Sequence, residues 1–125
     1  MRRMFLAMLL AAAVAPAAMA QGGHKHAETG PHGGPMQDVA GVHAELVVSD
    51  KTVTVFLYDE ADKPVPASGY GGSVLAGTGQ ARQVIALTAG ADNSLTGTGS
   101  APVGKPAGLT LQLRNPAGKS GQARY

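Results

Sequence analysis

Histidine is the residue type whose placement in this sequence most clearly suggests chemistry. All four histidines, at positions 24, 26, 32 and 43, fall within a stretch of 20 residues. Imidazole is the commonest metal ligand of proteins near neutral pH. His24 and His26 are two positions apart, so in an extended chain both rings lie on the same side and can bind one ion. His-rich tracts of this kind are typical of metal-binding segments.

A second pair of candidate ligands lies in a segment with the period of a strand. His43 and Glu45 are two apart within Val42–Val48, and we expect both to project from one face of a strand whose other face is apolar. Together with His24, His26 and His32, this rigid pair would form a composite metal site. The alternative is that the N-terminal histidines belong to a solubilising tail and that His43 and Glu45 belong to an ordinary solvated face.

The donor atoms of these residues restrict the choice of metal. Nitrogen and oxygen ligands without thiolates favour Cu(II), Zn(II) or Ni(II), and the intrinsic order of affinity places Cu(II) first. The sequence contains no cysteine. We therefore expect neither a thiolate site nor a disulfide, and the domain must be stable on its hydrophobic core alone.

The first 20 residues read as a secretory signal peptide. A basic start at Arg2 and Arg3 precedes an apolar run over Met4–Val14, and Ala18-Met19-Ala20 fits a cleavage site. The apolar run is too short for a membrane span. The sequence thus predicts export to the periplasm after cleavage of 1–20, without membrane insertion. The formal charge of +2 comes from the two arginines of this segment, so the mature chain is neutral and lacks the basic surface that nucleic acids require.

Composition divides the remaining chain into an arm and a domain. Residues 21–35 contain Gly, Pro and His but no large apolar side chain, which predicts a disordered arm. Residues 36–125 show alternating apolar positions and frequent turn residues. Val42–Val48 and Thr52–Tyr58 predict a β-hairpin, with Val53, Val55 and Leu57 facing inward. Further short strands are expected at Ser73–Ala76, Gln83–Thr88, Ser94–Thr98 and Leu109–Arg114, and at the end of the chain. About seven strands indicate an all-β fold, a small antiparallel sandwich of immunoglobulin-like type.

The sequence offers no sign of an enzyme. It contains no nucleophile elbow, no phosphate-binding loop followed by a helix, and no zinc-protease helix. The carboxylates other than Glu45 lie mostly in predicted turns, where solvation and turn formation explain them. We therefore expect a binding protein without catalytic residues.

Two segments carry a resemblance to a known group of proteins. Pro31-His32-Gly33-Gly34-Pro35, followed by Gly41–Val47, resembles the PHGG…G-x-H-x-E-L-V segment of small exported proteins of heavy-metal-resistant bacteria. Similar segments precede the core of the periplasmic adaptor subunits of heavy-metal efflux pumps. The similarity continues through 55–66, 73–88, 93–97 and 122–125.

The resemblance implies a β-sandwich involved in periplasmic metal handling, with His32, His43 and Glu45 at the matching positions. The mature chain keeps only Met36, which departs from methionine-rich copper(I) chaperones. The resulting hypothesis is an accessory protein that buffers or delivers a divalent metal for an efflux component in the envelope. The alternative is a β-sandwich that docks on an envelope partner and binds no metal.

Overall fold

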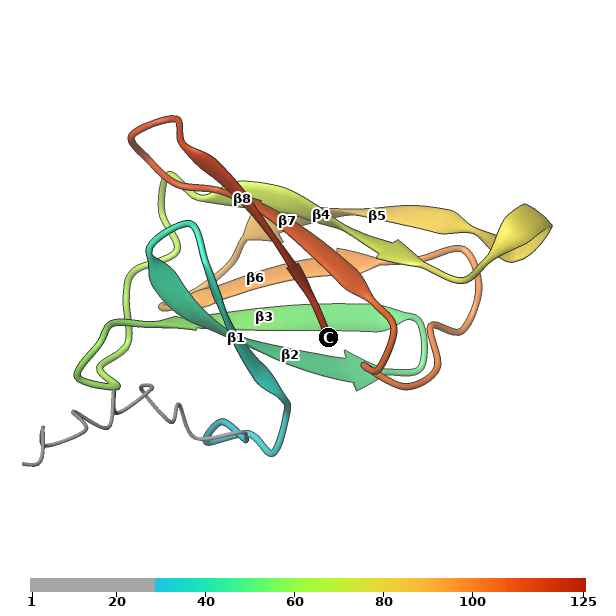
Figure 1. The fold of residues 1–125 in the computed structure, drawn as a ribbon, viewed down its shortest axis with the longest axis horizontal. Helices are drawn as coiled ribbons and strands as arrows, with labels where there is room; N and C mark the ends of the chain where they lie inside the picture. Colours follow the sequence, from blue (N-terminus) through green and yellow to red (C-terminus); the bar gives the residue numbers. More distant parts are fainter. Residues whose placement is uncertain (1–28) are drawn as a thin grey trace, which may run out of the picture.

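The computed structural model describes residues 29–125, and these residues form an all-β fold, as the sequence predicts. Eight strands and one short 3-10 turn, η1 (Gly79–Ala81), make up the regular structure of this part of the chain (Figure 1). No helix in it is long and apolar enough to cross a membrane. The strands are β1 (Met36–Val39), β2 (Val42–Ser49), β3 (Thr52–Tyr58), β4 (Gly71–Ala76), β5 (Gln83–Ala89), β6 (Ser94–Thr98), β7 (Thr110–Arg114) and β8 (Ser120–Arg124).

The predicted hairpin is confirmed as the antiparallel pair β2–β3, with Leu46 opposite Val55. Asp50 lies in the connecting turn with a φ of 53°, a left-handed conformation that Asp tolerates better than most residues. Val53, Val55 and Leu57 face inward, as predicted, and all three are completely buried. The sequence pattern does not predict strand β1. It pairs with β2 and adds one strand at the edge of the hairpin.

The eight strands follow the order β1-β2-β3-β6-β5-β4-β7-β8 in a sheet that folds into two layers (Figure 1). Strand β5 joins the layers, because its first part pairs with β4 while Thr88 and Ala89 pair with β6. The two edges of the sheet then approach each other. A Cβ atom on Gly121 of β8 would lie 2.7 Å from the backbone nitrogen of Ala40, at the end of β1, so only glycine permits this approach.

The core lies between the two layers and consists of aliphatic side chains from both. Burial of each such side chain contributes about 1.5–3 kcal/mol to the hydrophobic stabilisation of the fold. Tyr125 closes one side of the core, and its hydroxyl donates a hydrogen bond of 2.8 Å to the carbonyl oxygen of Ala44. The largest completely or almost completely buried members are Leu46, Leu57, Ile85, Leu95, Leu111 and Leu113.

The segment that precedes β1 is folded against the hairpin. Thr29 and Pro35 form a β-bridge, and the nitrogen of Gly30 donates a 2.7 Å hydrogen bond to the carbonyl oxygen of Gly34. The nitrogen of Leu46 then donates to the carbonyl oxygen of Pro35. Residues 29–35 belong to the range predicted as a disordered arm, but here they form a compact turn on the domain. The rest of that range, 21–28, lies outside the described residues, as does the predicted signal peptide.

Candidate functional site

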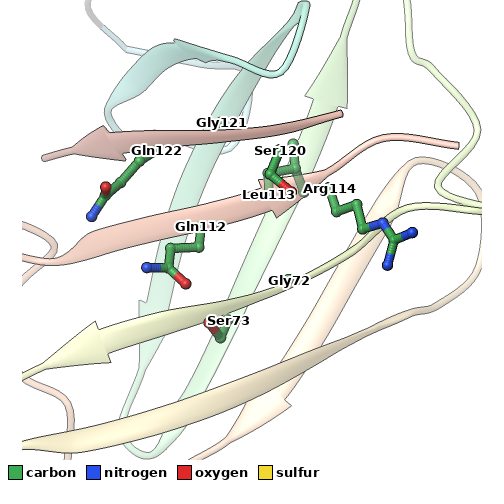
Figure 2. A pocket seen from close by; sticks show the side chains of 8 residues that line it. All are labelled: Gly72, Ser73, Gln112, Leu113, Arg114, Ser120, Gly121 and Gln122. Carbon is green, nitrogen blue, oxygen red and sulfur yellow. The ribbon is translucent and has the colours of Figure 1, made fainter. Parts of the chain in front are cut away.

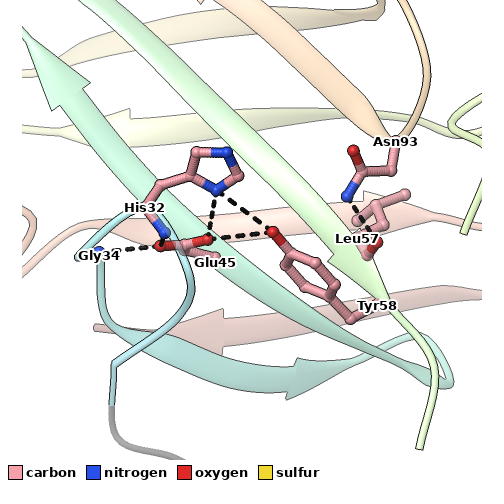
Figure 3. Close-up of polar contacts among 6 residues, drawn as sticks. All are labelled: His32, Gly34, Glu45, Leu57, Tyr58 and Asn93. Carbon is pink, nitrogen blue, oxygen red and sulfur yellow. Dashed lines mark hydrogen bonds and ion pairs between the residues drawn. The ribbon is translucent and has the colours of Figure 1, made fainter. Parts of the chain in front are cut away.

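Glu45 is the centre of a polar cluster on β2. Its side chain is completely buried, with a relative exposure of 0%. Oε2 accepts hydrogen bonds from the backbone nitrogens of His32 at 2.8 Å and Gly34 at 2.9 Å. Oε1 lies 2.9 Å from Nδ1 of His32 and 3.3 Å from the hydroxyl of Tyr58 (Figure 3). An ionised carboxylate accepts bonds from all four groups, so the cluster satisfies both oxygens of Glu45.

His32 is positioned by two contacts of different kinds. Its ring stacks on Phe56 with a centroid distance of 3.7 Å and an interplanar angle of 8°. Its Nδ1 atom points at Glu45, so in the neutral tautomer that donates to the carboxylate the proton is on Nδ1 and Nε2 keeps its lone pair. Nε2 lies on the side of the ring away from Glu45 (Figure 3). The side chain of His32 is 45% exposed, so solvent and solutes reach this ring.

Tyr58 completes the cluster from β3, the strand next to β2. Its hydroxyl lies 3.2 Å from Nδ1 of His32 and donates to Glu45. Burial, followed by the negative charge of Glu45, raises the pKa of Tyr58 above its ordinary value. The phenol therefore stays neutral and keeps its proton for the hydrogen bond. Sequence reasoning missed Tyr58 and Phe56, although both alternate with the inward-facing residues of β3 and so had to share the opposite face of the hairpin.

His43 belongs to a separate contact at the β1–β2 pair. Asp38 of β1 is directly opposite His43 in the register, and Nδ1 of His43 contacts Oδ1 of Asp38. Only 7% of His43 is exposed. The alternative in which His43 and Glu45 belong to an ordinary solvated face is therefore wrong. The two residues do share one face of β2, but the turn at 30–34 covers Glu45, and His43 is paired with Asp38 of the neighbouring strand β1.

The structure brings together some of the predicted ligands. It joins His32 to Glu45, and it places His43 with Asp38 instead. His24 and His26 lie outside the described residues. Within 29–125, no group of three or more His, Cys, Asp or Glu side chains is arranged to hold a metal ion. Of the two histidines in this part of the chain, His32 has the more exposed ring. Its Nε2 atom is directed away from Glu45 (Figure 3).

Comparison with known proteins adds no relative. No protein-family model matches the chain, and neither a curated protein nor a solved structure matches it.

Proposed function

We propose that the protein binds a divalent transition metal and that the Nε2 atom of His32 is one of the ligands. The observation that carries the proposal is the contact between Nδ1 of His32 and the buried carboxylate of Glu45. Histidines that bind metals commonly donate their other ring N–H to a carboxylate, which fixes the tautomer, orients the ring and increases the basicity of the ligand. Glu45 thus acts as a positioning residue in this proposal and does not itself touch the metal.

The environment of His32 suits a ligand that is held ready. Phe56 supports one face of the ring, and the turn at 30–34 is tied to Glu45 by two backbone hydrogen bonds. The ring therefore loses little conformational freedom when a metal binds. An imidazole on a mobile tail, by contrast, would lose conformational entropy when it binds the metal, and this loss would reduce the affinity.

The remaining ligands are proposed from the sequence. His24 and His26 precede His32 by eight and six positions, which is a chain length sufficient to bring their rings to the same ion. Imidazole ligands favour Cu(II), Zn(II) or Ni(II). His43 is the second candidate within the domain, because its contact with Asp38 is also a carboxylate–histidine pair. Its low exposure makes it the less accessible of the two.

In the cell, this activity would be that of a metal buffer or carrier. We propose a non-enzymatic periplasmic protein that delivers metal to, or holds it for, an efflux component of the envelope. The predicted signal peptide and the resemblance of the PHGG segment support this placement. The competing proposal is a periplasmic β-sandwich that docks on an envelope partner and binds no metal. In that case the histidines have only a structural role.

Isothermal titration with Zn(II) and Cu(II) separates these two proposals. We expect saturable binding at micromolar metal, weakened at least about tenfold in His32→Ala, since a lost imidazole ligand removes a full metal bond. His43→Ala removes the less accessible of the two imidazoles and should weaken binding less than His32→Ala does. Absence of saturable binding in the wild type would reject the metal proposal and favour the docking module.

A further inference from the structure

A hollow lies on the outer face of strands β4, β7 and β8. The residues that line it are distant in the sequence from the four histidines. Its volume is about 470 Å³, and residues of these three strands line it (Figure 2). The side chains around it come from all three strands. The polar ones are Ser73, Gln112, Arg114, Ser120 and Gln122. The other lining positions are two glycines and Leu113, whose side chain is buried in the core.

The register of the strands explains why these side chains gather. Ser73 is opposite Gln112, and Gln112 is opposite Gln122, so the three form one row across the layer. Arg114 and Ser120 form part of the next row, beside Gly71. A Cβ atom on Gly71 would have no atom within 4 Å, so this position leaves open space next to the arginine. The alternate residues of the same strands are buried in the core: Val74, Leu111, Leu113 and Ala123.

The polar groups of this face are not used within the fold. None of the five polar side chains makes a hydrogen bond or an ion pair with another residue among those that the structure describes. The two glutamines present both donors and acceptors, the serines present hydroxyls, and Arg114 presents the donor fork of its guanidinium. Figure 2 shows Gln112 and Gln122 side by side, with Arg114 farther along β7.

The charge of this face is positive. No Asp or Glu follows Asp92 in the sequence, whereas Arg114, Lys119 and Arg124 lie on β7, on β8 or between them. No carboxylate side chain lines the hollow. The face therefore attracts an anionic ligand rather than a cation, which separates it chemically from the histidine site.

We infer that this face binds a carboxylate-bearing oligosaccharide. A sugar chain offers hydroxyls that match the amides and hydroxyls of the row Ser73–Gln112–Gln122, and a uronic-acid carboxylate fits the bidentate guanidinium of Arg114. Leu113 is the one large apolar residue that lines the hollow, and its side chain is buried in the core, so the apolar anchor of a peptide would find few partners there. The inference is independent of metal binding.

Titration of the full protein with trigalacturonate, followed by two-dimensional NMR, tests this inference. We expect shifts confined to β4, β7 and β8, and affinity at least about tenfold weaker in Arg114→Ala, since a charge-assisted bidentate contact is worth at least that factor. Gln112→Ala should weaken binding as well. Arg82→Ala removes an exposed cation outside this face and serves as the matched control, with unchanged affinity.

Two further probes decide between charge, sugar and peptide. The methyl ester of trigalacturonate keeps the hydroxyls without the charge, and triglutamate keeps the carboxylates without the sugar. Both should bind at least about tenfold more weakly than trigalacturonate. Equal binding of either probe, equal binding by Arg114→Ala, or no shifts on this face with trigalacturonate would overturn the inference.

Discussion

The Nδ1 atom of His32 lies 2.9 Å from Oε1 of Glu45, 13 positions further along the chain. The exposed ring and the completely buried carboxylate thus form one unit, and two backbone hydrogen bonds tie the turn at 30–34 to the same carboxylate. Removing either partner changes the other. The carboxylate would lose the side-chain donor for Oε1, and the ring would lose the group that fixes its tautomer.

Replacing Glu45 by alanine should destabilise the protein by about 3 kcal/mol, because it leaves the nitrogens of His32 and Gly34 and the hydroxyl of Tyr58 without their acceptor. Urea unfolding measures the loss. Glu60→Ala, in the exposed turn after β3, is the matched control and should change the unfolding free energy by less than about 0.5 kcal/mol. A comparable loss in both variants would show that the buried cluster has no special role.

Gly30→Ala should destabilise the protein by about 1–3 kcal/mol, the usual range for an overpacked site. The added Cβ would lie 2.6 Å from Oε1 of Glu45, whose hydrogen bonds leave it no room to move. Gly71→Ala is the control, because a Cβ there meets nothing within 4 Å. Equal thermal unfolding of the two variants would contradict the tight packing of the turn against Glu45.

Much of the fold can be read from the sequence because its apolar residues alternate with period two. The hairpin β2–β3 and the inward face of Val53, Val55 and Leu57 follow directly from that pattern. Strand β1 escapes it, because Met36–Val39 contains too few apolar residues to show alternation and depends on pairing with β2.

The site was harder to predict, for a related reason. Alternation shows that His43 and Glu45 share a face, but it does not show whether another segment covers that face. Here the cover is the turn at 30–34, whose sequence lacks large apolar residues and therefore looks disordered. It is held by hydrogen bonds to a buried carboxylate and by the stacking of His32 on Phe56. Neither contact leaves a local signature in the sequence.

Alkaline conditions should destabilise the protein through Tyr125. Burial raises the pKa of its phenol above the ordinary 10.0. Above about pH 10 the unfolded chain therefore loses this proton first, and the unfolding free energy falls as the pH rises. Tyr125→Phe should lower the unfolding free energy by about 1 kcal/mol at neutral pH, because the hydrogen bond to Ala44 is lost. The unfolding free energy of this variant should then fall less steeply at high pH than that of the wild type. Urea unfolding between pH 8 and about 11 measures this, and parallel profiles would contradict it.

Glu45→Gln separates the tautomer of His32 from the integrity of the fold. The amide oxygen can still accept from the nitrogens of His32 and Gly34, while the amide NH₂ donates to Nδ1 of His32. That arrangement moves the ring proton to Nε2. Zinc affinity should then fall about 10–100-fold, as for other outer-shell substitutions, with far smaller changes in unfolding than in Glu45→Ala. Unchanged zinc affinity would mean that Glu45 does not position a ligand.

The most direct test of the central proposal is a zinc titration of the wild-type protein followed through the ring nitrogens of His32 by ¹⁵N NMR. We expect a metal-free ring whose tautomer carries its proton on Nδ1, and a large shift of Nε2 that saturates at micromolar zinc. Acidification should reverse the shift, because bound imidazole must be neutral. Saturable zinc binding that leaves the ring nitrogens of His32 unchanged, or a metal-free ring protonated on Nε2, would contradict the proposal that His32 is a metal ligand.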